Sequence, residues 1–131
     1  MPGPGSYDYA VIRVVPRVER EEFVNVGVIV SCPAHDFLEA RIELDAQRVG
    51  ALDATLDLQA LRDHLAAIPL ICQGGPAAGP IGQLSRRERF RWLVAPRSAV
   101  IQMSPAHSGR CEDPHKLLEH LLQTMVRAPQ R

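Results

Sequence analysis

The sequence predicts an α+β domain: an antiparallel β-meander of three strands plus one later strand, covered by helices in a two-layer sandwich. Two observations lead to this fold class. Residues 7–42 alternate between two faces with the period typical of strands, and the connections between them are too short for a crossover helix. Apolar residues then recur at helical spacing, so strands come first and helices follow.

The first predicted strand spans residues 7–15. Pro16 ends it, because proline has no N–H to donate to a neighbouring strand. The third strand is predicted at residues 37–42, after a turn at residues 33–36. The later strand is predicted at residues 99–103.

The second predicted strand, residues 23–32, is unusual because it contains Asn25 and Gly27. Both fall on one face, which we expect to be less buried or to approach another backbone closely. The opposite face carries four valines, which we expect to lie together in the core: Val24, Val26, Val28 and Val30.

Helix signals follow the meander. A short helix is predicted at residues 45–52, and a longer one starts at the N-cap Asp57 and is broken or kinked by Pro69. Residues 74–82, GGPAAGPIG, are predicted to form a mobile loop, and they contain no phosphate-binding motif.

Two further helices are predicted in the second half of the chain. Ser85 and Glu88 form the capping box S-x-x-E that opens the third helix. Asp113, followed by proline, is the predicted N-cap of the last helix. The apolar side of that helix fits either a core face or a dimer surface and contains Leu117, Leu118, Leu121, Leu122 and Met125.

The length of 131 residues fits one domain, which we place at residues 7–127, between a disordered tail at 1–6 and a C-terminal tail at 128–131. The apolar runs are too short to cross a membrane and the start lacks a secretion signal, so we expect a cytoplasmic monomer or homodimer. The three cysteines are widely spaced, which favours reduced thiols over disulfides.

Charge is unevenly distributed, although the formal net charge is zero. Residues 1–66 carry a net charge of −5 and residues 67–131 one of +5. The two halves can neutralise each other within one fold, or the second half can present a basic surface to an anionic partner.

The densest polar segment is SRRERFRWLVAPRS, residues 85–98. Arginines beside aromatic rings are typical of surfaces that bind phosphates, nucleic acid or acidic proteins. On a helix, however, the arginines would face water while Phe90 and Leu93 face the core, and the zero net charge disfavours nucleic acid. The predicted basic patch consists of Arg86, Arg87, Arg89 and Arg91.

The chain resembles a bacterial family known only as domain of unknown function (DUF) 3037 in three segments: YDYAVIRVVP at 7–16, EFVNVGV at 22–28, and ERFRWLVAPRSAVIQMSPAHSGRCEDP at 88–114. The family pattern has glycine where Glu21 stands, so we expect the turn before it to be built differently here. The resemblance implies no established activity. It does imply an accessory or interaction partner of a HipA-like kinase.

Motif residues in these segments predict a polar site that binds a ligand or a protein partner. A sheet face would supply Arg13 and Asn25, and Gly27 would allow another group to approach. Loop residues would complete the site, although Arg97 could instead form an internal ion pair with an acid such as Glu22. The full predicted set is Arg13, Asn25, Gly27, Arg97, Ser98, His107 and Arg110.

Residues 105–115, PAHSGRCEDPH, hold several groups with catalytic chemistry. Their spacing lacks the paired ligands of a zinc site, so we predict neither a metal nor a cofactor. The catalytic alternatives are Cys111 as a nucleophile with His107, or a phosphoesterase- or nuclease-type hydrolase that uses His107, Asp113 and arginines. Over these we favour a non-enzymatic accessory module that binds a protein or a ligand.

Overall fold

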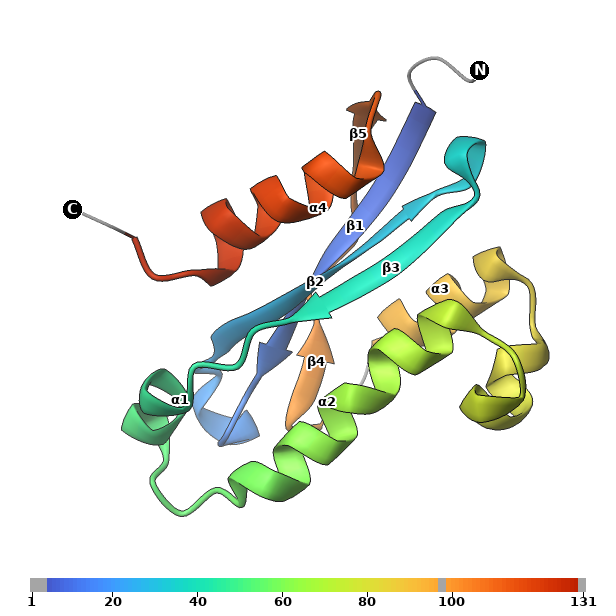
Figure 1. Cartoon of the computed structure of the whole chain (residues 1–131). Coiled ribbons are helices and arrows are strands. Elements are labelled where there is room, and N and C mark those ends of the chain that lie inside the picture. Colours follow the sequence, from blue (N-terminus) through green and yellow to red (C-terminus); the bar gives the residue numbers. More distant parts are fainter. Residues whose placement is uncertain (1–4, 97–98, 130–131) are drawn as a thin grey trace.

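The computed structural model describes residues 5–96 and 99–129. At its centre lies a twisted antiparallel sheet, with helices on both sides (Figure 1). The predicted α+β class and antiparallel sheet are therefore confirmed. The five strands are β1 (Gly5–Val14), β2 (Val24–Cys32), β3 (Phe37–Ile42), β4 (Ile101–Met103) and β5 (His107–Cys111).

The predicted meander is present, since β1 pairs with β2 and β2 pairs with β3. Strand β1 begins at Gly5, inside the segment predicted to be a disordered tail, and two residues before the predicted start of the strand. Its other edge pairs with β4 at residues 12–14 and with β5 at residues 5–9. β4 lies within the predicted later strand, whereas β5 is an additional strand that no sequence pattern indicated.

Strands β4 and β5 run along the same edge of β1 and are separated by a break at Ser104. There the buried Ser104 Oγ accepts a hydrogen bond of 2.8 Å from the Val11 N–H and donates one of 2.9 Å to the Pro105 carbonyl. The Ser104 N–H in turn donates to the Val11 carbonyl at 2.8 Å. A side-chain hydroxyl thus supplies the acceptor that Val11 needs where the regular ladder stops.

Strand β2 contains a β-bulge between Asn25 and Gly27, the two residues that made its sequence unusual. Arg13 pairs with Asn25 and Ile12 pairs with Gly27, so Val26 is the extra residue. The bulge reverses which face the following side chains occupy. The prediction that the four valines lie together is therefore wrong: Val24 and Val26 belong to one apolar cluster, and Val28 and Val30 to another.

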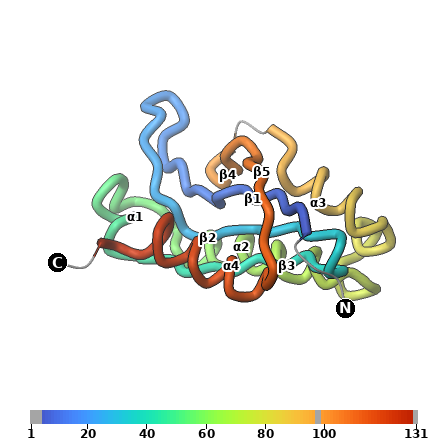
Figure 2. The backbone as a smooth tube through the Cα atoms, turned by 90° about the horizontal axis from the view of Figure 1, so that it is seen from above, coloured from blue at the N-terminus to red at the C-terminus, as the bar shows by residue number. Residues whose placement is uncertain are grey.

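The two clusters lie on opposite faces of the sheet. Helices α2 and α3 cover one face, and α4 with the turn that follows it covers the other, as both views of the chain show (Figures 1 and 2). The predicted two-layer arrangement is therefore corrected to three layers. The helices are α1 (Ala46–Leu52), α2 (Leu58–Gln73), α3 (Arg86–Val94) and α4 (Pro114–Leu121), the last continuing as a π-helical turn, Leu122–Val126.

Helix α2 does not end at Pro69 but continues to Gln73. Five residues of its apolar side are buried against the sheet, and this packing outweighs the one backbone hydrogen bond that proline removes: Leu61, Leu65, Ile68, Ile71 and Cys72. The three predicted N-caps at Asp57, Ser85 and Asp113 are confirmed. Asp45, predicted as the first residue of the short helix, is instead its N-cap. The glycine-rich segment forms short 3-10 turns at Pro76–Gln83.

The two oppositely charged halves of the chain pair with each other in several places. Cations of the second half contact acids of the first in the pairs Arg86–Asp36, Arg87–Asp8 and Arg127–Glu43. This supports the first of the two alternatives given for the uneven charge. Within the described ranges, no helix is long and apolar enough to span a membrane.

Candidate functional site

The face of the sheet that α4 covers ends in a polar region around Arg13. Arg13 lies on β1 between Asn25 of β2 and Gln102 of β4, its partners in the two ladders. All three side chains therefore lie side by side on this face. Residues from three segments far apart in the sequence meet here.

The Arg13 guanidinium stacks on an exposed aromatic ring. Its Cζ lies 4.1 Å from the centroid of the Phe23 ring, the geometry of a cation–π contact. The Arg13 Nε is buried and has no hydrogen-bond partner among the described residues, and none of their acids forms an ion pair with this arginine. Arg13 thus retains hydrogen-bonding capacity at the edge of the core.

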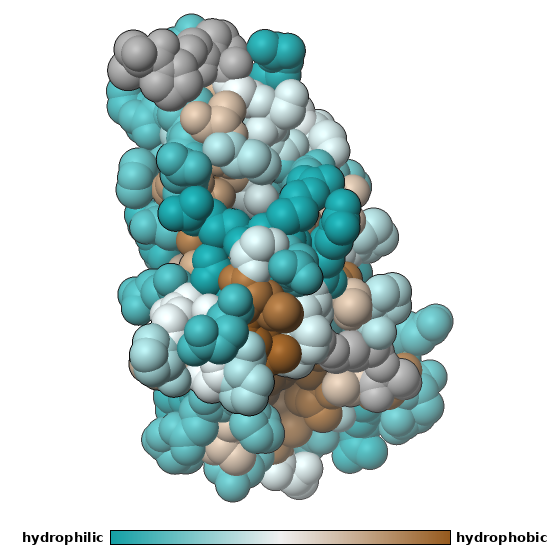
Figure 3. Space-filling view, turned by 90° about the vertical axis from the view of Figure 1, so that its right-hand side faces the viewer, coloured by the Kyte–Doolittle hydropathy of each residue, from teal (hydrophilic) through white to brown (hydrophobic). Residues whose placement is uncertain are grey.

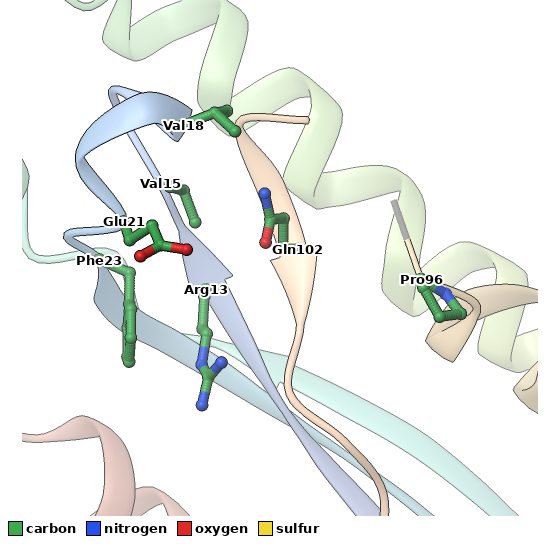
Figure 4. Close-up of a pocket in the computed structure, with 7 residues that line it drawn as sticks. All are labelled: Arg13, Val15, Val18, Glu21, Phe23, Pro96 and Gln102. Carbon is green, nitrogen blue, oxygen red and sulfur yellow. The ribbon is translucent and has the colours of Figure 1, made fainter. Parts of the chain in front are cut away.

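A hollow of about 610 Å³ adjoins this guanidinium (Figure 4). We call it the Arg13 pocket. It combines charged, amide and apolar groups in one concavity, which is the composition typical of ligand-binding sites. Its walls are formed by Arg13, Val15, Val18, Glu21, Phe23, Pro96 and Gln102.

Glu21 enters this pocket from a turn with a left-handed backbone. Its φ of 58° lies in the region that favours glycine. Glutamate thus occupies a backbone conformation that glycine adopts without strain. The prediction that this turn is built differently from the family's stays a prediction. A non-glycine residue in this conformation is strained, and such strain often marks functional positions.

Asn25 lies beside Arg13 as predicted, but part of its amide has a structural role. Its Nδ2 donates a hydrogen bond of 2.9 Å to the Met125 carbonyl at the end of the chain's last helix. Gly27 lies outside the pocket. A Cβ at this position would lie 2.5 Å from the Arg41 carbonyl oxygen, so glycine is required by the neighbouring strand rather than by a ligand.

The remaining predicted site residues do not join this group. Arg97 and Ser98 lie outside the described residues. His107 pairs with Tyr9, four residues from Arg13, which corresponds to about 13 Å along the strand. Arg110 is three residues beyond His107 on β5 and so points to the opposite face of the sheet. The structure therefore does not bring Gly27, His107 and Arg110 together with Arg13.

The arginines of α3 do not form a uniform basic patch. Arg86, Arg87 and Arg91 are exposed. The side of the molecule that faces right in Figure 1 is largely hydrophilic, with an apolar patch near its centre (Figure 3). Arg89, in contrast, is only 6% exposed, and its guanidinium packs against Gly74 so closely that a Cβ there would lie within 3 Å of it. The expectation that all four face water is wrong for Arg89.

The residues considered for catalysis lie apart from one another or already make structural hydrogen bonds. Asp113 accepts hydrogen bonds from the His115 and Lys116 N–H groups as the N-cap of α4. Burial beside Cys32 raises the pKa of Cys111, which opposes formation of a nucleophilic thiolate. The described residues contain no group of three or more His, Cys, Asp or Glu side chains placed to hold a metal ion.

Sequence reasoning missed three residues of the pocket: Glu21, Phe23 and Gln102. A signal was available for Glu21, because a glutamate in place of a family glycine implies either a rebuilt turn or a strained one. Phe23 carried a weaker signal, since an aromatic residue on the same face as Asn25 could be buried or exposed. Gln102 had none, because its contact with Arg13 depends on the pairing of β1 with β4.

Comparison with known proteins gives one match. A family model described as "Protein of unknown function (DUF3037)" matches residues 9–126, nearly the whole chain. No curated protein and no solved structure matches.

Proposed function

Because the chain belongs to the DUF3037 family, whose description assigns no activity, we propose from its geometry that it is a small non-enzymatic binding module. The Arg13 pocket is its binding site. The ligand carries an anionic group that the Arg13 guanidinium holds.

One observation carries this proposal. Arg13 is half-buried beside a 610 Å³ hollow, stacks on Phe23, and forms no ion pair with any acid in the described part of the chain. Guanidinium groups bind carboxylates and phosphates with paired hydrogen bonds, and an aromatic ring behind the guanidinium fixes its plane. A protein without an anionic ligand would gain little from placing an arginine in this way.

The hydrolase alternative lacks an equivalent geometry. His107 lies about four residues along β1 from Arg13, Asp113 is occupied as a helix cap, and Arg110 points to the other face. General acid–base catalysis requires such groups to reach a common point. Nothing in the described geometry favours this function over binding.

We extend the proposal to the partner that the family resemblance implies, a HipA-like kinase, and to the bacterial cytoplasm as the place of action. In this role the domain binds the kinase as an accessory and carries the pocket as a sensor of a ligand. The support for this partner is the resemblance alone. The support for the pocket is geometric and is independent of the partner.

The pocket is tested by titrating ¹⁵N-labelled protein with a panel of small carboxylates and phosphates. We expect backbone shifts at residues 13, 23 and 102 in the wild type and none in Arg13→Ala. Arg62→Ala is the matched control, because Arg62 is an exposed arginine on α2. If no anion in the panel shifts these residues, the pocket is not a binding site for anions.

The partner is tested separately by biolayer interferometry with a purified HipA-like kinase from the same genome. Saturable binding with a dissociation constant in the micromolar range or below supports an accessory role. Absence of binding removes the kinase from the proposal and leaves the pocket untouched.

A further inference from the structure

The Arg13 pocket contains two opposite charges that do not pair with each other. The Arg13 guanidinium and the Glu21 carboxylate both line it, yet the described residues show no ion pair between them. In Figure 4 the Glu21 carboxylate lies near the upper end of the Phe23 side chain, and the guanidinium extends beside the lower end. The pocket thus offers a donor group and an acceptor group at separate places.

Gln102 lines the same pocket from β4 and offers a further acceptor. Its Nε2 is occupied by a hydrogen bond of 2.8 Å to the Ala99 carbonyl. The Oε1 of the same amide has no hydrogen bond within the described part of the chain and remains available to accept one. The two ends of the pocket therefore have opposite preferences: one for an anion, the other for a cation or an N–H donor.

Glu21 combines a strained backbone with a side chain that lines this pocket. At a φ of 58° glycine would avoid strain of about 1 kcal/mol or more. Glutamate instead places a carboxylate at the mouth of a hollow whose other walls include Val15, Val18 and Pro96. The carboxylate also disfavours ligands with several negative charges, such as nucleotides.

We propose that the Arg13 pocket binds a short zwitterionic peptide of about two apolar residues. Its carboxylate binds Arg13, its ammonium group binds Glu21 and the Gln102 Oε1, and its side chains pack on Val15, Val18 and Phe23. The two charged groups lie beside opposite ends of the Phe23 side chain (Figure 4), so a ligand that binds both must span the length of that side chain. The inference rests on the proposed function, because it names the ligand of the same site.

Chemically blocked peptides test the two ends separately. Isothermal titration would compare Leu-Leu with N-acetyl-Leu-Leu, which lacks the ammonium group, and with Leu-Leu amide, which lacks the carboxylate. We expect each blocked form to bind at least tenfold more weakly than the free dipeptide. Phe-Leu and Val-Leu serve as further probes for the apolar wall.

Variants then assign each end to a residue. Arg13→Ala should remove the preference for the free carboxylate, and Glu21→Gln should remove the preference for the free ammonium group. Thus the difference in affinity between Leu-Leu and N-acetyl-Leu-Leu should be several-fold smaller in Glu21→Gln than in the wild type, with the remainder due to the Gln102 Oε1. Arg62→Ala should bind all three forms as the wild type does, and a thermal melt confirms that each variant is folded.

The outcomes distinguish this inference from the function on which it rests. If N-acetyl-Leu-Leu binds as tightly as Leu-Leu and the binding depends on Arg13, the zwitterion is overturned while the anion site stands. If no dipeptide binds but a simple carboxylate or phosphate shifts residues 13, 23 and 102, the peptide is likewise overturned. If neither peptides nor anions bind, both proposals fail.

Discussion

The two faces of the sheet differ in how completely helices cover them. On one face, α2 and α3 bury a continuous apolar surface that includes Ile12, Ile29 and Leu65. On the other, α4 covers Val28 and Val30 and leaves the region around Arg13 open. The first face is core where α2 and α3 cover it, whereas the second is core under α4 and has a pocket beyond it.

This difference shows how one sheet combines stability with a binding site. The helical segment that follows α4 ends near Met125, whose carbonyl bonds to Asn25, and the Arg13 pocket opens beside Asn25's strand partner Arg13. The bulge at Val26 lies close by and moves the valines that follow to the α4 side. Arg13 can therefore reach solvent without interrupting the apolar core on the opposite face.

The strongest test of the comparison removes one buried leucine from each face. Leu65→Ala and Leu118→Ala should each lower the free energy of unfolding by about 3 kcal/mol, because both side chains are almost fully buried and leave cavities. Urea denaturation followed by circular dichroism measures this. Leu84→Ala, a change at a partly exposed leucine, is the control. A loss below about 1 kcal/mol for Leu118→Ala would contradict a cooperative core on the α4 face.

The second test addresses Gly27, next to the bulge that places the valines before and after it on different faces of the sheet. Gly27→Ala should destabilise by about 2 kcal/mol, because the added Cβ meets the backbone oxygen of Arg41 and the strands must move apart. Gly50→Ala is the matched control: it has open space around it within α1 and should stabilise by roughly 0.5–1 kcal/mol. Similar melting behaviour of the two variants would show that β3 accommodates the extra atom.

The third test separates stability from binding at the open end. Glu21→Gly should stabilise the fold by about 0.5–1 kcal/mol through relief of the left-handed strain, and should weaken dipeptide binding. Asp36→Gly relieves a similar strain at φ 50° outside the pocket and should leave binding unchanged. Thermal melts and titrations of both variants measure the two effects. Dipeptide binding as tight in Glu21→Gly as in the wild type would show that the Glu21 carboxylate does not bind the ligand.

The smallest effect on stability is expected for the ion pairs that Arg127 forms with Glu43 and Glu119. Hydrogen bonds from Arg127 lower the pKa of Glu43 and of Glu119 from their ordinary value near 4.5. A lowered folded pKa stabilises the protein above the unfolded value and loses this contribution as the pH falls below it. Stability should therefore decline between about pH 5 and pH 3, and less so in Arg127→Ala.

Urea midpoints of the wild type and Arg127→Ala measured across this range check the expectation. Arg91→Ala, an exposed arginine of α3, serves as the control and should keep the wild-type pH dependence. Equal pH dependence in the wild type and Arg127→Ala would show that these ion pairs are too well solvated to contribute.

Features that depend on neighbours in the sequence could be predicted from it. The caps at Asp57, Ser85 and Asp113 could be predicted because an N-cap side chain bonds to backbone groups two or three residues away. The alternation in β1 and the order of the meander were predictable for the same reason, since short connections leave few pairings. Of the proposed site, this reasoning found Arg13 and its position beside Asn25.

Features that depend on distant contacts were decided by the tertiary structure. The bulge at Val26 lies next to Gly27, which approaches the Arg41 carbonyl of the neighbouring strand, and the alternation of the valines could not be extended through it. Arg89 is buried because the glycine-rich turns fold against α3, although its sequence context resembles that of its exposed neighbours. Glu21, Phe23 and Gln102 meet Arg13 only where a turn, a strand and a late strand converge. Local spacing thus set the elements and their ends, while the packing between them determined which polar side chains share a pocket.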